Sequence, residues 1–227
     1  MKEDLIEVIA ILDVSGSMFP IMNDTIGGFN AYLQELASQD QEIIITLILF
    51  SNQSRIIIER QNVKSCIQLT EKIYRPMGGT ALIDALGLAI TNTKQHLQQL
   101  NEDNKPGKVS FFVSTDGEEN SSKMYSKQQV RQMVKQCIDD QKWEFIFAGA
   151  NIDAFATGES LGFERRNIAN IENDGVGQKA VYEIMAKKQS CNAMFAPSAN
   201  RRYENEAFNC DQDVQAMYSK RSKQMRK

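Results

Sequence analysis

Histidine, proline and tryptophan are scarce in this chain of 227 residues. It has one His, four Pro and one Trp, and its four Cys include no CxxC pair. A zinc site built from Cys and His needs several such ligands at close spacing, and the sequence shows none. The single histidine, His96, lies among polar residues late in a predicted helix, which favours a solvated side chain. Neither Ser15 nor Ser17 stands in a GxSxG motif, and GxxxxGK[ST] is absent, so the sequence offers neither a nucleophile elbow at these serines nor a phosphate loop.

Long apolar runs and a strong net charge are missing as well. No run reaches the ~18 to 20 residues that a membrane span requires. The formal net charge of −3 gives no argument for binding to nucleic acid or to an anionic membrane. The first residues, MKEDLIEVIA, carry acids where a signal peptide would be basic. We therefore expect a cytoplasmic protein with free thiols and no membrane association.

Apolar strands alternate with helical patterns along the chain. Helical spacing is expected after Pro20, where Asp24 is a candidate N-cap, and after Ser126, which forms a capping box with Gln129. The last helix of the pattern is expected near residues 174–189. Strands are expected at 6–12, 42–50, 55–60, 108–115, 143–150 and near 167–171.

The connections between these elements predict the fold class. The loop between the strands at 42–50 and 55–60 is short enough only for an antiparallel hairpin. The other strands are nearly continuous apolar runs separated by helices, which is typical of a parallel sheet covered on both faces. The sequence predicts an α/β fold with a doubly wound, mostly parallel six-stranded sheet, one antiparallel edge strand and helices on both faces.

Five oxygen-bearing side chains follow the ends of these elements. Asp13, Ser15 and Ser17 stand at every second position where the first strand stops, Thr80 follows two glycines at a helix start, and Asp116 comes just after the strand at 108–115. In open α/β sheets ligands bind at the carboxyl ends of the strands. We therefore expect two carboxylates and three hydroxyls to converge at one edge of the sheet.

This combination resembles the von Willebrand factor A (vWA) domain and its metal-ion-dependent adhesion site. The family pattern is DxSxS after the first strand, a Thr in a later loop and an Asp in a TDG-type loop, and the resemblance covers about residues 5–189. Stretches such as TIGGFN, GGTALIDA, TDGEEN and WEFIFAGANIDA are similar to stand-alone intracellular bacterial and phage vWA proteins. The resemblance implies that Asp13, Ser15, Ser17, Thr80 and Asp116 form a metal site.

The chemistry of the donors agrees with that implication. All five are hard oxygen donors, which suit Mg²⁺ or Mn²⁺, with Ca²⁺ less favoured. Two carboxylates could balance the charge of a divalent ion, but if one Asp binds through water, the ion keeps net positive charge and an unfilled position. An Asp or Glu of a partner protein is the expected further ligand. Asp84, Glu118 and Glu119 are candidates for a supporting role, although helix-dipole and solvated-loop explanations serve as well.

Two alternatives remain open from the sequence. Asp13 as a phosphoryl acceptor would make the protein a Mg²⁺-dependent phosphatase-like enzyme, but position 15 is Ser and no Lys stands in the stretches 11–20, 76–86 and 114–120 around the donors. Residues 198–227 are rich in Lys and Arg, which is a weak indication of nucleic-acid binding. We expect a non-catalytic vWA domain over residues 1–190. For the extension at 191–227 we favour a flexible basic tail over a docked helix bearing Val214, Met217, Tyr218 and Met225.

Overall fold

A six-stranded sheet forms the centre of the protein in the computed structural model, which describes residues 1–172, 174–191 and 209–225. The strands are β1 (Lys2–Asp13), β2 (Glu42–Phe50), β3 (Ser54–Asn62), β4 (Pro106–Thr115), β5 (Glu144–Ala150) and β6 (Ile168–Ile171). The helices are α1 (Met22–Ala37), α2 (Leu82–Gln99), α3 (Lys127–Gln141), α4 (Ala154–Ser160), α5 (Gly175–Cys191) and α7 (Cys210–Met225).

The strand order of the sheet is β3-β2-β1-β4-β5-β6. β3 pairs antiparallel with β2 at one edge, and every other neighbouring pair is parallel. β1 and β4 lie side by side at the centre, with Leu12 opposite Ser114 near their carboxyl ends. The predicted doubly wound α/β fold with one antiparallel edge strand is confirmed.

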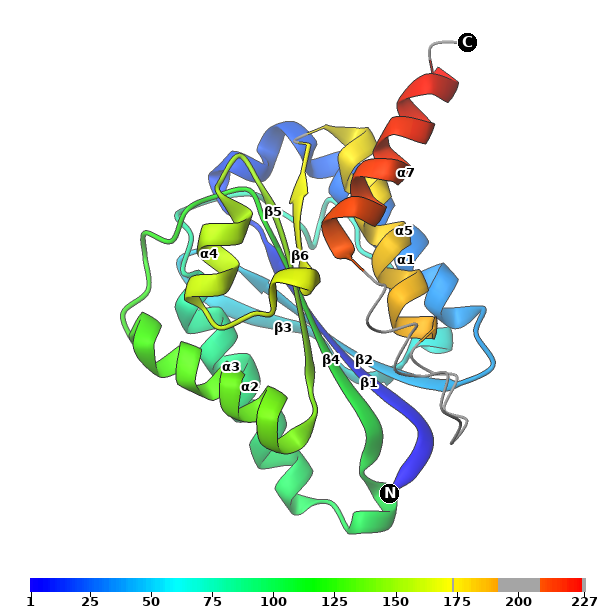
Figure 1. The fold of residues 1–227 in the computed structure, drawn as a ribbon, viewed down its shortest axis with the longest axis vertical. Helices are drawn as coiled ribbons and strands as arrows, with labels where there is room; N and C mark the ends of the chain where they lie inside the picture. The colour runs from blue at the N-terminus through cyan, green and yellow to red at the C-terminus, as the bar shows by residue number, and fades with distance from the viewer. Residues whose placement is uncertain (173, 192–208, 226–227) are drawn as a thin grey trace.

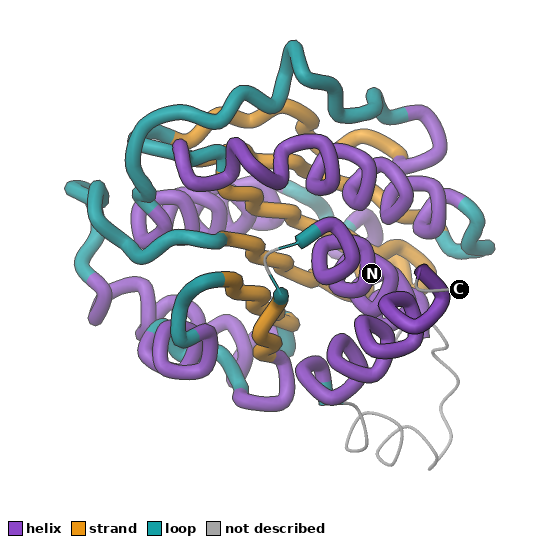
Figure 2. The backbone as a smooth tube through the Cα atoms, turned by 90° about the horizontal axis from the view of Figure 1, so that it is seen from above, coloured by secondary structure: helices purple, strands orange, loops and turns teal. Residues whose placement is uncertain are grey.

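Two separate hydrophobic cores cover the two faces of the sheet. Successive residues of β1 alternate between them: Ala10 and Leu12 join the core under α1 and α5, whereas Ile9 and Ile11 join the core under α2 and α3. Figure 1 shows α1, α5 and α7 on one side of the strands and α2, α3 and α4 on the other. Figure 2, seen from above, shows the strands as a layer between the helices. This double burial explains why the strands are apolar at nearly every position.

The predicted helix caps were right at one place and wrong at another. Ser126 and Gln129 form the expected capping box at the start of α3, and Asp153 caps α4 by accepting from the backbone N–H of Ala156. Asp24, however, lies inside the first turn of α1, and Ile21 is the N-cap residue. A 3-10 turn over Gly16–Ile21, which contains Pro20, brings the chain into the helix earlier than the sequence suggested.

Helix α7 covers the open edge of strand β6. Its Cys210 and Val214 are buried in the same core as α5. The Asp211 carboxylate accepts from the backbone N–H of Asn170 at 2.9 Å, and the Gln215 amide donates to the carbonyl of Asn170 at 3.0 Å. Over residues 210–225 the structure therefore shows the docked helix and not the flexible tail that we favoured.

The remaining expectations for the extension are not settled by this helix. Residues 192–208 and 226–227, which carry much of the basic tail, lie outside the described residues. The domain division at residue 190 stays a prediction. None of the helices in the described ranges has the length and apolar character needed to cross a membrane.

Candidate metal centre

The predicted donors lie together at the carboxyl edge of the sheet. Asp13 ends β1, Asp116 follows the end of β4, and Thr80 precedes α2. The Ser17 hydroxyl donates to Asp116 Oδ1 at 2.6 Å and lies 3.0 Å from the hydroxyl of Ser15. Because β1 and β4 are parallel neighbours, the side chains that follow them are brought to one place despite a long separation in sequence.

Gly117 marks the point on which three of these loops converge. A Cβ atom at this glycine would lie 2.9 Å from Thr80 Oγ1, 3.6 Å from Ser17 Oγ and 3.8 Å from Asp13 Oδ2. Oxygens from the segments that follow β1 and precede α2 therefore lie close to Gly117 in the loop after β4, and a side chain at position 117 would press on the Thr80 hydroxyl. Glycine is the residue that permits this approach.

Both carboxylates of the site are buried without a compensating positive charge. Burial raises the pKa of Asp13 to about 6, although hydrogen bonds from Thr115 and Ser15 oppose the shift. Burial also raises the pKa of Asp116. Within the described ranges neither carboxylate forms an ion pair with Lys or Arg. An added cation would therefore relieve the cost of charging both groups.

The donor set passes a direct test for fit to a cation. Asp116 Oδ2 is buried and has no hydrogen-bond partner among the described residues, a costly state for a carboxylate oxygen unless a ligand satisfies it. No group of three or more His, Cys, Asp or Glu suited to a metal occurs in the described part of the chain. The candidate site has two carboxylates, with hydroxyls as the other donors, so its chemistry is that of a hard oxygen site of low charge.

Two residues that the sequence analysis did not single out hold Asp13 in place. The Thr115 hydroxyl donates to Asp13 Oδ2 at 2.5 Å, and the hydroxyl of buried Tyr74 donates to the backbone carbonyl of Asp13. Thr115 directly precedes Asp116, so alternation along β4 could have pointed to it. Tyr74 lies in an irregular segment with no pattern to reveal its partner.

Replacing Thr115 by valine is expected to raise the pKa of Asp13 above about 6. The valine keeps the shape of the side chain but removes the hydrogen bond that favours the charged carboxylate. An NMR titration of the carboxyl carbons in metal-free protein measures the shift. Ser114→Ala is the control, because Ser114 lies next to Thr115 and points to the opposite face of β4. An unchanged Asp13 pKa in Thr115→Val would contradict this assignment.

Asp84 and Glu119 tie the loop after β4 to the start of α2. The Asp84 carboxylate accepts from the backbone N–H groups of Lys123, Met124 and Tyr125 at 2.7–2.9 Å. Glu119 accepts from the backbone N–H of Ile83 at 2.8 Å and from three groups of residues 121–122. Asp84 thus does more than favour the helix dipole, and the solvated-loop interpretation is wrong for Glu119.

Two asparagines make further hydrogen bonds in these loops, and Glu118 is exposed to solvent instead. Asn52 Oδ1 accepts from the backbone N–H of Gly79 at 2.7 Å, and Asn120 Oδ1 accepts from that of Thr80 at 2.9 Å. These asparagines fix the loop that carries Thr80, and the sequence analysis missed both. Glu118 is exposed, as a solvated loop residue would be.

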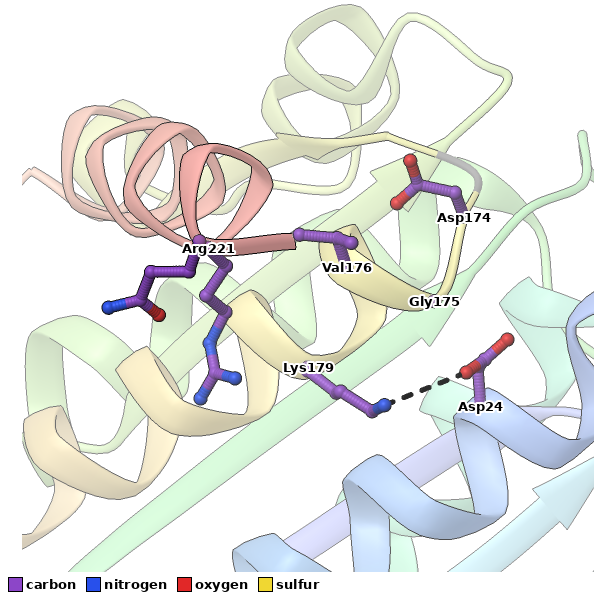
Figure 3. Close-up of a pocket in the computed structure, with 7 residues that line it drawn as sticks. Asp24, Asp174, Gly175, Val176, Lys179 and Arg221 are labelled. Carbon is purple, nitrogen blue, oxygen red and sulfur yellow. Dashed lines mark ion pairs between the residues drawn. The ribbon is translucent and has the colours of Figure 1, made fainter. Parts of the chain in front are cut away.

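A pocket of about 610 Å³ lies apart from these donors, between the start of α5, α7 and α1 (Figure 3). Lys179 and Asp24 form an ion pair across it at 4.0 Å. Arg221, which also lines the pocket, pairs with Glu183. Both cations of the lining are thus already matched by carboxylates of the protein, and the five predicted donors are not among its described lining residues.

Comparison with solved structures places this geometry in a known fold. Proximal thread matrix protein 1 from the mussel byssus, with a zinc-occupied MIDAS motif, matches with a TM-score of 0.60 at 11% identity, over 82% of this chain and 48% of that one. The vWF domain of the type V pili tip protein Mfa5 from Porphyromonas gingivalis gives 0.58 at 8% identity, over 86% and 98%. A von Willebrand factor type A structure from Catenulispora acidiphila gives 0.52 at 13% identity, over 82% and 42%.

These similarities define the class of fold. The chain has the fold of a vWA domain, and it spans about half or less of the mussel and Catenulispora chains. Neither the family models nor the curated proteins gave a match to the sequence. The fold brings the oxygen donors to the edge where the sequence resemblance expected a metal-ion-dependent adhesion site.

Proposed function

We propose that the protein is a divalent-metal-dependent protein-interaction module. The observation that carries this proposal is the pair of buried carboxylates beside the hydroxyls of Ser17 and Thr80, with one carboxylate oxygen that has no partner among the described residues. A buried carboxylate oxygen in that state is expected to have a ligand.

Asp13, Ser15, Ser17, Thr80 and Asp116 would hold the ion. Mg²⁺ or Mn²⁺ is the proposed ion because the donors are all hard oxygens. When bound, it would supply a centre of positive charge, which stays incompletely neutralised if one of the two carboxylates binds through water. An Asp or Glu of a partner protein is the complementary group, because Coulomb attraction is stronger in a partly dehydrated site than in water.

Other features favour interaction over catalysis. Some proteins that share the fold are described as a pilus tip protein and a minor pilin, which are parts of assemblies. A phosphatase-like role for Asp13 would call for a catalytic Lys beside it, and no ion pair joins Asp13 to Lys or Arg in the described ranges. We retain the stand-alone intracellular type and a cytoplasmic location as proposals that rest on the sequence resemblance.

Titration calorimetry with MgCl₂ and MnCl₂ tests the metal site. We expect one ion to bind to the wild type and none to bind to Asp13→Ala, which removes a buried ligand. Ser126→Ala is the control: it removes the cap of α3, costs about 0.5–2 kcal/mol of stability and leaves metal affinity unchanged. Equal metal affinity in the wild type and Asp13→Ala would refute the assignment.

A further inference from the structure

Three strongly exposed apolar side chains stand on the segments that carry the candidate metal donors. Phe19, Met77 and Met124 are 68%, 67% and 64% exposed, the highest values among the exposed large hydrophobic residues of the described ranges. Each stands on a different loop: Phe19 follows Ser17, Met77 precedes Thr80, and Met124 lies in the segment after Asp116. Single exposed apolar residues are ordinary, whereas exposed apolar residues on each segment of a candidate site favour an interaction surface. We call these three residues the apolar collar.

Hydrogen bonds hold each collar residue in a fixed loop. The backbone N–H of Met77 donates to the carbonyl of Val14 at 2.8 Å, and that of Met124 donates to Asp84 Oδ1 at 2.9 Å. The carbonyl of Phe19 accepts from the N–H of Met22 within the turn that leads into α1. The collar is therefore a prearranged surface, which reduces the ordering cost of binding a partner.

The charges beside the collar favour an acidic partner. Arg75 stands two residues before Met77, and Lys123 directly precedes Met124; both are exposed. Neither forms an ion pair with another described residue. Glu71 and Glu118 are exposed acids of the same loops, and Lys72 is a third exposed cation there. With a divalent cation at the centre, this face would present positive charge and apolar side chains together, and complementary charge steers a partner towards it.

We propose that the collar binds a partner segment in which an Asp or Glu is flanked by large apolar side chains. This inference rests on the proposed function, because the carboxylate of the segment is the group offered to the metal centre. Its apolar neighbours would then contact Phe19, Met77 and Met124. Methionine suits such a surface, since its flexible, polarisable side chain adapts to different apolar partners.

Selection from a library of short randomised peptides on the immobilised full chain tests the proposal. Binding is carried out in MnCl₂, and bound peptides are eluted with EDTA. We expect the enriched peptides to share an Asp or Glu with a large apolar residue within two positions. The most enriched peptide, made synthetically, should lose binding when its acid becomes the amide and should weaken when its apolar residue becomes Ser.

Variants of the collar provide the second arm. Phe19→Ser, Met77→Ser and Met124→Ser should each weaken binding of that peptide about tenfold or more, as residues at the centre of an interface do. Their Mn²⁺ affinity, measured by calorimetry without peptide, should match that of the wild type. Ile67→Ser is the control, because Ile67 is 49% exposed and lies near the beginning of the segment that carries Met77, where Leu69 is hydrogen-bonded to Asn30 in the middle of α1.

The possible outcomes separate this inference from the proposed function. Acidic peptides enriched without an apolar preference, or collar variants that bind as the wild type does, would overturn the collar and leave the metal-dependent module standing. If the protein binds the metal but no peptide is enriched in the EDTA eluate, the proposed role of the collar is also overturned. Failure of the wild type to bind Mg²⁺ or Mn²⁺ would remove the proposed function itself.

Discussion

Asp13→Asn is expected to make the metal-free protein more stable at pH 7, by about 1–3 kcal/mol of unfolding free energy. The upper figure corresponds to the rise in the pKa of Asp13 from 3.8 to about 6 on burial. Asparagine avoids burying a charge, but it loses one acceptor for the Thr115 hydroxyl, which reduces the gain. Chemical denaturation in EDTA measures the difference. Lower stability of the variant under these conditions would contradict the prediction.

The stability difference between Asp13→Asn and the wild type should depend on pH and on metal. The folded pKa of Asp13 lies above its unfolded value, so its contribution to stability is fully present below pH 3.8 and is lost as the pH rises through about 6. The advantage of Asp13→Asn should therefore shrink as the pH falls from 7 towards 4. Adding Mn²⁺ at pH 7 should reverse the order, because only the wild type gains a ligand. Asp153→Asn is the control, since Asn serves as a helix N-cap as well as Asp does.

Asp84→Ala is expected to lower the free energy of unfolding by about 2–4 kcal/mol. It would leave the backbone N–H groups of Lys123, Met124 and Tyr125 without their acceptor. The side chain is only 8% exposed, so water does not readily replace it. Urea denaturation measures the loss.

The matched variants for this prediction differ in how many acceptors they keep. Asp84→Asn retains Oδ1, which serves two of the three donors, and should lose less stability than Asp84→Ala. Asp103→Ala removes a fully exposed carboxylate and should change stability little. A loss under about 1 kcal/mol in Asp84→Ala would mean that the loop finds other partners.

The fold and the position of the site could be predicted because both follow from short-range patterns and topology. Strands buried on both faces are apolar at almost every position, as in β1, and parallel strands place their carboxyl ends together. Asp13 and Asp116 each follow such a strand, so their meeting required no knowledge of the loops. The register of β1 against β4 then brought them together as expected.

The residues that support the site could not be predicted, because their partners are distant in sequence. Tyr74, Asn52, Asn120 and Glu119 lie in polar or irregular loops, where no periodicity indicates a partner. Glu119 looked like a solvated acid, yet it accepts hydrogen bonds from residues of two segments. In such loops the tertiary placement decides which hydrogen bonds form.

Helix α7 is a second case in which contacts distant in sequence could not be predicted. Its helical spacing was visible in the sequence, but its many charged residues favoured a solvated tail. The deciding contacts are those of Asp211 and Gln215 with the backbone of Asn170, and they exist only once β6 is in place.

Those two contacts give α7 a protective role against self-association. A free strand at the edge of a sheet offers its N–H and carbonyl groups to any other extended chain and so promotes aggregation. At the opposite edge, β3 interrupts its ladder with irregular register and exposes the charged Arg55 and Glu59. At the β6 edge, α7 occupies the N–H and carbonyl of Asn170. A shortened chain that ends before α7 would leave these groups open to another molecule.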